Sequence, residues 1–160
     1  MGYALTVPHP LNASTIPDVE ARMERYEIAA FIRNARSVSS DSQVEQQQLN
    51  SLLAHARGAA DRFLDSYYHA DGFTHNPFKL AEKQTVSVQI DSILQLSAHS
   101  HEVRWTETVH DLNGANLGVA THWEAQLQTE RIAPNSSDAI VSNPLCLYVT
   151  QISWTQQQAQ

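Results

Sequence analysis

The spacing of hydrophobic residues changes once along the chain, after Lys83. Before this residue, apolar side chains recur every three or four positions, which is the repeat of amphipathic α-helices. After it, apolar and polar side chains alternate, as in β-strands that bury one face. Helices followed by strands predict an α+β domain, with the helices packed on one face of a curved, four-stranded antiparallel sheet.

Three helices are expected before this change. The first begins within residues 15–18, where Thr15 can cap the helix and Pro17 fits the first turn because its missing N–H costs nothing there. Its second half carries an apolar stripe at helical spacing, which comprises Ile28, Phe31, Ile32 and Ala35. This stripe is expected to lie on the sheet.

The second helix follows a capping box over residues 40–43 and ends or bends at Gly58. Its apolar stripe comprises Val44, Leu49, Leu52, Leu53 and Ala56. The third helix carries an apolar stripe made of Ala60, Phe63, Leu64 and Tyr67. It ends before Asp71 and Gly72, whose turn chemistry predicts a loop over residues 71–78.

The strands follow from the alternation after Lys83. Residues 85–96 change phase once, which predicts a β-bulge near Asp91 and Ser92. The remaining elements are, in order, strands over 101–109 and 119–132, a helical turn over 137–142, and a last strand within residues 143–154 with Pro144 at its beginning. Both faces of this last strand carry bulky side chains, which predicts a central strand or one covered on both faces.

A single hydrophobic cluster is predicted between the helices and the sheet, from the apolar side of each element. Its expected members are Phe31, Ile32, Phe63, Trp105, Trp123 and Leu127. The inward positions of the strands, which include Val103 and Ala125, are all apolar or small in this interpretation. We therefore identify no inward-facing acidic side chain from the sequence.

Length and composition limit the class of protein. A chain of 160 residues with 42% hydrophobic residues is long enough for one domain with a single core. The formal charge of -7, with 10 Lys and Arg residues and no basic run, argues against direct binding to nucleic acid. The single cysteine, Cys146, excludes an intramolecular disulfide and a multi-cysteine zinc site. No apolar run approaches the roughly 18 residues that span a bilayer.

The side chains capable of chemistry form no catalytic or metal-binding pattern. His99 and His101 are the closest histidines, but they fall in a predicted turn and local spacing supplies no third ligand. Cys146, between two leucines, is interpreted as a small buried hydrophobe. Glu102 and Glu107 are interpreted as part of a solvated strand face. We therefore predict no catalytic residue, no metal and no cofactor.

Two runs of residues resemble a known family. They are Val103-Arg104-Trp105-Thr106-Glu107 and Asn143-Pro144-Leu145-Cys146-Leu147-Tyr148-Val149. With the helix-forming segments before them, they resemble the periplasmic domain of TrbF-type conjugal transfer proteins, in the same order over residues 20–156. One departure is Cys146, where that family usually has glycine. A side chain there puts in doubt any role that needs close backbone approach.

The resemblance implies a fold, a location and partners. The implied fold is a cystatin-like or nuclear-transport-factor-like cone, in which helices wrap a strongly curved sheet. Members of this family are assembly factors of type IV secretion systems and are not known as enzymes. They have a cytoplasmic tail, one helix in the inner membrane and this domain in the periplasm. The implied partners are other secretion subunits and further copies of the protein, as a dimer or higher oligomer.

The expected organisation follows from the resemblance. Residues 1–14 form a flexible arm or a non-native lead-in, residues 15–156 the periplasmic assembly domain, and residues 157–160 a polar tail. The residues expected to act in assembly are Asn143, Pro144, Leu145 and Tyr148. Alternatively, this run only holds the last strand in register. A second alternative is an isomerase-like protein on the same fold, with an acid or histidine inside an apolar pocket. A third is a periplasmic carrier of a small ligand or peptide, which would have an open apolar cleft without such a group.

Overall fold

The first helix, α1 (Thr15–Arg36), packs its second half on the sheet. The computed structural model describes residues 15–158, so the predicted arm over residues 1–14 lies outside the described residues. The helix begins where the sequence predicts, and its stripe of Ile28, Phe31, Ile32 and Ala35 is buried. Among the described residues, no helix is long and apolar enough to cross a membrane.

The second helix, α2 (Ser42–Ala54), starts one residue later than the capping box predicts. Its N-cap is Asp41, whose carboxylate accepts hydrogen bonds from two N–H groups of the first turn at 2.9 and 3.4 Å. Val44 and Leu53 are 38% and 48% exposed, so their assignment to the buried stripe was wrong. The helix directs these two side chains to either side of Leu52, which is fully buried.

The third helix, α3 (Ala59–Phe73), follows Gly58, an N-cap with a φ of 61° that suits glycine. Its backbone leaves helical geometry over residues 70–72, close to the predicted end of the helix. A further short helix, α4 (Pro77–Leu80), stands where the sequence predicts a loop. The carboxamide of Asn76 caps it, which explains how four residues adopt helical geometry there.

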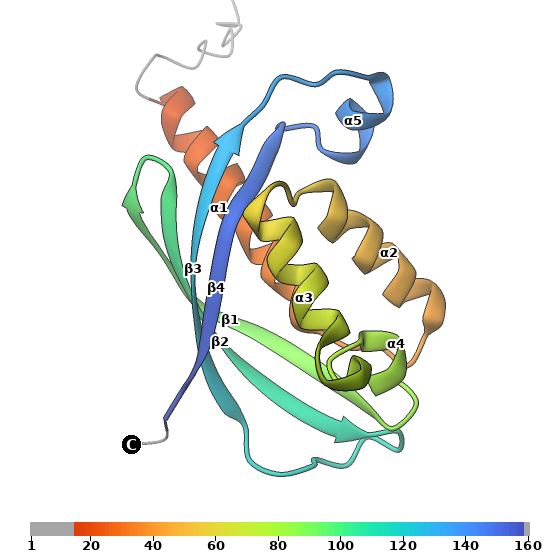
Figure 1. The fold of residues 1–160 in the computed structure, drawn as a ribbon. Coiled ribbons are helices and arrows are strands. Elements are labelled where there is room, and N and C mark those ends of the chain that lie inside the picture. The colour runs from red at the N-terminus through yellow and green to blue at the C-terminus, as the bar shows by residue number, and fades with distance from the viewer. Residues whose placement is uncertain (1–14, 159–160) are drawn as a thin grey trace, which may run out of the picture.

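Four strands form one antiparallel sheet in the order β1-β2-β3-β4. They are β1 (Gln84–Ser97), β2 (Ser100–Asp111), β3 (Thr121–Arg131) and β4 (Leu147–Gln157). The pairing of β1 with β2 shifts between Ile90 and Ser92, which confirms the predicted bulge. A short helix, α5 (Ser137–Ser142), stands between β3 and β4, as the sequence predicts. The helices lie on one face of a curved sheet (Figure 1), which confirms the predicted α+β architecture.

The last strand, β4, lies at an edge of the sheet, so the first of the two predicted alternatives, a central strand, was wrong. Leu147, Tyr148 and Val149 are buried in succession, so the start of the strand is covered on both faces, which is the second alternative. Its bulky first half is nevertheless buried, because the connector between α2 and α3 lies beside it. The N–H of Val149 donates to the carbonyl of His55 at 2.7 Å, and the N–H of Arg57 donates to the carbonyl of Val149 at 3.0 Å. This connector therefore protects the edge of β4 where the strand begins.

The hydrophobic core lies between the helices and the inner face of the sheet. Four of the predicted core residues are at most 3% exposed and belong to one cluster: Phe31, Ile32, Trp105 and Leu127. Phe63 and Trp123 are partly buried and pack against this cluster. On the inner face of the sheet, the rings of Trp105 and Trp123 stack with their centres 6.3 Å apart.

Candidate functional site

An ion pair lies inside the domain, between the end of α1 and β2. Arg36 Nε and Nη2 donate to the two carboxylate oxygens of Glu107 at 2.6 and 2.8 Å. The two side chains are only 6% and 8% exposed. The interpretation of Glu107 as part of a solvated strand face was therefore wrong. Glu107 stands two residues after Trp105, so strand alternation places both side chains on the inner face.

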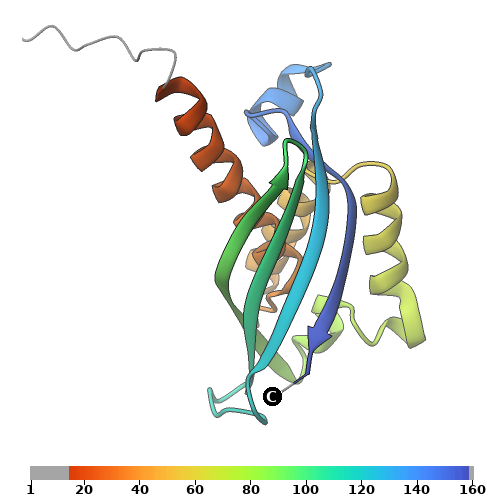
Figure 2. The ribbon, with the colours of Figure 1, turned by 90° about the vertical axis from the view of Figure 1, so that its left-hand side faces the viewer.

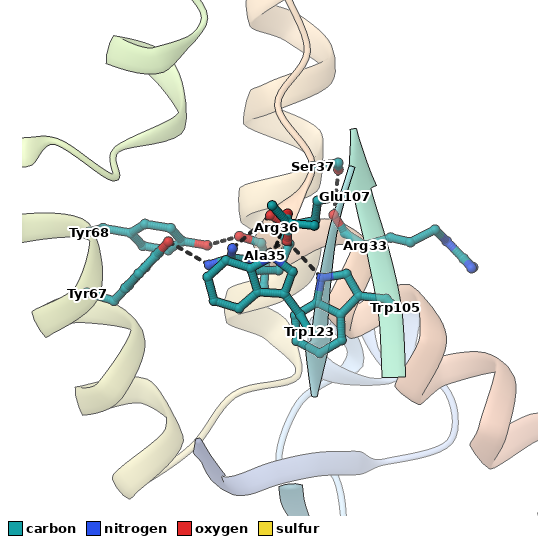
Figure 3. A network of polar contacts seen from close by, with 10 residues as sticks. Arg33, Ala35, Arg36, Ser37, Tyr67, Tyr68, Trp105, Glu107 and Trp123 are labelled. Atoms are coloured by element: carbon teal, nitrogen blue, oxygen red, sulfur yellow. Dashed lines mark hydrogen bonds and ion pairs between the residues drawn. The ribbon is translucent and has the colours of Figure 1, made fainter. Parts of the chain in front are cut away.

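Aromatic side chains surround this ion pair (Figure 3). Trp105 Nε1 donates to the carboxylate at 2.7 Å, and Arg36 Nη1 donates to the hydroxyl of Tyr67 at 2.6 Å. The guanidinium carbon lies 4.1 Å from the ring centre of Trp123 and 5.0 Å from that of Trp154, both within cation–π range. All three guanidinium nitrogens and both carboxylate oxygens therefore have a partner.

The ionisation of these groups follows from their burial and their neighbours. Burial alone would lower the pKa of Arg36, but the hydrogen bond and negative charge of Glu107 outweigh it and raise the pKa. Burial raises the pKa of Tyr67 despite the nearby charge of Arg36. Burial also raises the pKa of Tyr68 far above its ordinary value, and the Tyr68 hydroxyl donates to the carbonyl of Ala35 at 2.7 Å. Both tyrosines therefore act as neutral donors or acceptors at ordinary pH.

A cavity of about 240 Å³ lies next to the ion pair, with Arg36, Tyr67, Glu107 and Trp123 in its wall. A general acid or base must offer a free atom to a bound molecule. Both oxygens of Glu107 already accept hydrogen bonds from Arg36 or Trp105. The carboxylate and the guanidinium also neutralise each other. In this geometry Glu107 therefore holds the fold together, and the cavity gains no net charge from the pair.

The two neighbouring histidines lie in different surroundings. His99 is exposed in the turn between β1 and β2, whereas His101 is part of β2 and is 2% exposed. The Nδ1 atom of His101 has no hydrogen-bond partner among the described residues. Burial lowers the pKa of His101, while the charge of Glu24 opposes this effect and that of Arg25 adds to it. Over residues 15–158, no three His, Cys, Asp or Glu side chains are placed to hold a metal ion.

The run that contains Asn143 and Tyr148 joins α5 to β4. The side chain of Asn143, which is 1% exposed, donates to the carbonyl of Leu147 at 2.7 Å and accepts from its N–H at 3.1 Å. It also donates to the carbonyl of Ala54, at the end of α2, at 3.4 Å. Tyr148 is 5% exposed, and the guanidinium carbon of Arg57 lies 4.0 Å from its ring centre. Both side chains are therefore used inside the domain.

Other residues at the same corner of the molecule face solvent. Pro144 is exposed and Leu145 is half-buried. On α5, Ile140 and Val141 are 51% and 83% exposed. Sequence alone did not single out this pair, because a short helical pattern does not tell which of its side chains the rest of the fold covers. Cys146 has a φ of 53°, a left-handed conformation that glycine adopts more easily than a residue with a side chain.

Comparison with known families decides the relationship that the sequence suggests. The family described as VirB8 protein matches residues 6–157. The chain belongs to the VirB8 family. The conjugal transfer protein TrbF of Rhizobium radiobacter is 27% identical over 160 residues, which are 98% of this chain and 69% of TrbF. The predicted resemblance to TrbF is confirmed, and the chain is a VirB8-type component of type IV secretion systems.

Solved structures share the fold of this VirB8-family domain. A TrwG component from Bartonella birtlesii gives a TM-score of 0.74 at 22% identity, covering 86% of this chain and 93% of that one. The VirB8 protein of Agrobacterium tumefaciens gives 0.73 at 12% identity, covering 85% and 92%. TraE in complex with 4-(1H-pyrrol-1-yl)pyridine-2-carboxylic acid gives 0.71 at 14% identity, covering 85% and 96%. At these identities the likeness concerns the fold alone.

Proposed function

We propose that this domain is a non-enzymatic assembly component of a type IV secretion channel and acts through protein–protein contacts in the periplasm. In this proposal a single helix anchors the full-length protein in the inner membrane, and the domain binds other secretion subunits and further copies of itself. Membership of the VirB8 family supports the choice of system. The surface around α5 supports a role in contacts.

The observation that carries the proposal is the pair of exposed aliphatic side chains on α5, Ile140 and Val141, at 51% and 83% exposure. A helix of 6 residues is too short to be stable by itself. Asn143 holds its end in place through hydrogen bonds to Leu147 on β4 and Ala54 on α2. A partner that covers such a preorganised apolar projection gains about 25 cal/mol per Å² buried, with little ordering cost.

The residues of the run over 143–148 then divide between two roles. Asn143 and Tyr148, both buried, position α5 and the start of β4. Pro144 is exposed and Leu145 is half-buried, and in this proposal these two residues, which closely follow α5 in the chain, extend the contact surface. The assembly role and the structural role of this run are therefore compatible, because different residues carry them.

The proposal is tested with Val141→Asp in the full-length protein. Because Val141 is 83% exposed, this variant should fold and melt like the parent. After crosslinking in membranes, fewer secretion subunits should be recovered together with this variant than with the parent. DNA transfer between cells should fall by about tenfold. Val119→Asp is the matched control, because Val119 is 91% exposed on the connection between β2 and β3. If Val141→Asp recovers subunits and transfers DNA as well as Val119→Asp, α5 is not the contact.

A small-ligand-binding protein is the second candidate, because the cavity of about 240 Å³ beside Arg36 could admit a small organic molecule. TraE, on the same fold, is known in complex with an aromatic carboxylic acid. The weakness of this candidate is that Glu107 already neutralises Arg36, so a carboxylate gains little there. Titration of the domain with 4-(1H-pyrrol-1-yl)pyridine-2-carboxylic acid separates the candidates. Tight binding that the double variant Arg36→Met, Glu107→Leu abolishes while it stays folded, with normal subunit recovery by Val141→Asp, would favour the ligand-binding role.

A further inference from the structure

The outer edge of β1 is open to another strand. Figure 2 shows β1 as the last strand on one side of the sheet. The chain itself begins to extend the sheet there with one residue, Val38, from the connector between α1 and α2. The N–H of Val38 donates to the carbonyl of Val86 at 3.1 Å, and the N–H of Val86 donates to the carbonyl of Val38 at 3.0 Å. This edge is therefore competent to pair with an antiparallel strand.

Beyond Val86, the outward-facing backbone groups of β1 have no paired strand among the described residues. In an antiparallel pair, alternate residues direct their N–H and C=O groups away from the neighbouring strand. Counting from Val86 and allowing for the bulge, these residues are Val88, Ile90, Ile93 and Gln95. Among the described residues, one side chain donates a hydrogen bond to this row: Arg25 Nη2 donates to the carbonyl of Ile93 at 2.9 Å.

The composition of β1 does not protect this edge. Proteins guard free edge strands with lysine, proline, inward-pointing charge or a β-bulge, and of these devices β1 carries the bulge between Ile90 and Ser92. Residues 84–97 contain no lysine and no proline, and their one charged residue, Asp91, accepts a hydrogen bond from Thr106 on β2 at 2.7 Å. Leu94 and Leu96 are 56% and 50% exposed. A strand that pairs here would therefore cover backbone groups and apolar side chains together.

The helix beside this edge presents positive charge. Arg22, Arg25 and Arg33 follow each other at spacings of three and eight residues, which places them on one side of α1. Arg25 reaches β1, and Arg33 points away from the buried network (Figure 3). Within residues 15–158, none of the three arginines forms an ion pair. One acidic residue, Asp18 in the first turn, lies on the same side of α1 as the three arginines, so this side keeps a net positive charge.

We infer that the free edge of β1 binds an extended, acidic segment of a partner protein, which adds a strand to the sheet next to the arginines of α1. The backbone row supplies affinity in the way that strand addition does elsewhere. The arginines supply the preference for acidic side chains and increase the association rate. The inference rests on the proposed assembly function, because it names the chemistry of one partner segment. It concerns a surface other than α5.

The test uses the full chain and two short peptides, one alternating valine with glutamate and the other alternating valine with lysine. The acidic peptide should bind about tenfold more tightly at low salt, as measured by fluorescence anisotropy. On binding, the amides of Val88, Ile90 and Gln95 should become protected from hydrogen exchange. Arg25→Glu should remove the preference for the acidic peptide. The matched control is Arg62→Glu, an exposed arginine on α3 that forms no ion pair among the described residues.

A backbone variant checks the strand pairing independently of charge. Gln95→Pro removes one outward N–H without removing a hydrogen bond to β2. It should therefore weaken binding of the acidic peptide more than Gln95→Ala does. Equal binding of the two peptides, or no protection of the β1 amides, would overturn the inference. Self-association through this edge would also overturn it. If the molecular mass of the parent in solution rises with concentration and that of Gln95→Pro does not, a second copy of the chain occupies the edge. None of these results would affect the α5 test, so the two proposals fail separately.

Discussion

Arg36 and Glu107, 71 residues apart in the chain, meet in a two-point ion pair inside the domain. This relationship ties the end of α1 to β2, and through the hydroxyl of Tyr67 it also reaches α3. Tryptophan and tyrosine rings surround the pair, so water solvates neither charged group to a large extent. Its consequence is that one buried ion pair joins three elements: α1, β2 and α3.

Removing one partner of this pair should destabilise the domain strongly. Glu107→Ala is expected to lower the free energy of unfolding by about 3–5 kcal/mol, because it leaves the charge of Arg36 buried without a partner. The double variant Arg36→Met, Glu107→Leu should lose less than the sum of the two single variants. Urea unfolding of the four proteins measures this coupling. A loss below about 1 kcal/mol for Glu107→Ala would contradict the buried pair.

Asn143 should be needed for stability. Asn143→Ala removes a side chain that makes two hydrogen bonds to Leu147 and one to Ala54, and leaves those buried backbone groups unpaired. The expected loss is about 2–3 kcal/mol in the free energy of unfolding. Asn135→Ala is the control, because Asn135 is exposed. Equal melting temperatures of the two variants would show that Asn143 does not fasten α5 and β4.

Replacing Cys146 with glycine should stabilise the domain. The φ of 53° at Cys146 is a left-handed conformation that costs a residue with a Cβ about 1 kcal/mol, whereas glycine adopts it freely. Part of the gain is offset by the greater freedom of glycine in the unfolded chain, so Cys146→Gly should gain less than about 1 kcal/mol. The opposite change, Gly58→Ala at a φ of 61°, should destabilise. Thermal unfolding of both variants checks the sign, and a destabilised Cys146→Gly would contradict the expectation.

The stability of the domain should fall in mild acid because of His101. Burial lowers the pKa of this histidine in the folded state below its ordinary value of 6.5. As the pH falls below 6.5, the unfolded chain therefore binds the proton first, and stability decreases towards the folded pKa. Between about pH 7.5 and about pH 5 the parent should lose more stability than His101→Gln. His99→Gln, at an exposed position, should lose as much as the parent, and identical slopes for all three would refute the assignment.

The sequence by itself determined the order and type of most elements. Periodicity is a local property, so the change of spacing after Lys83 was sufficient to predict helices before an antiparallel sheet, including the bulge after Ile90 and the helical turn at α5. The same local chemistry predicted the turn that contains Asn143, although not the carbonyl of Ala54 that its side chain reaches. The resemblance to TrbF-type proteins could likewise be recognised from the order of a few short runs of residues.

Only the tertiary structure decided what covers each face and edge. Glu107 was assigned to solvent because it is charged, yet its alternation with Trp105 places it inside, where Arg36 of a distant helix neutralises it. Similarly, the bulky start of β4 indicated either a central strand or one covered on both faces, and only the structure shows an edge strand beside the connector around Ala56. Exposure of Val141 on α5 and burial of His101 depend in the same way on segments far apart in sequence. Periodicity defines the two sides of an element, but the packing partner that makes one side the inside is a long-range property of the fold.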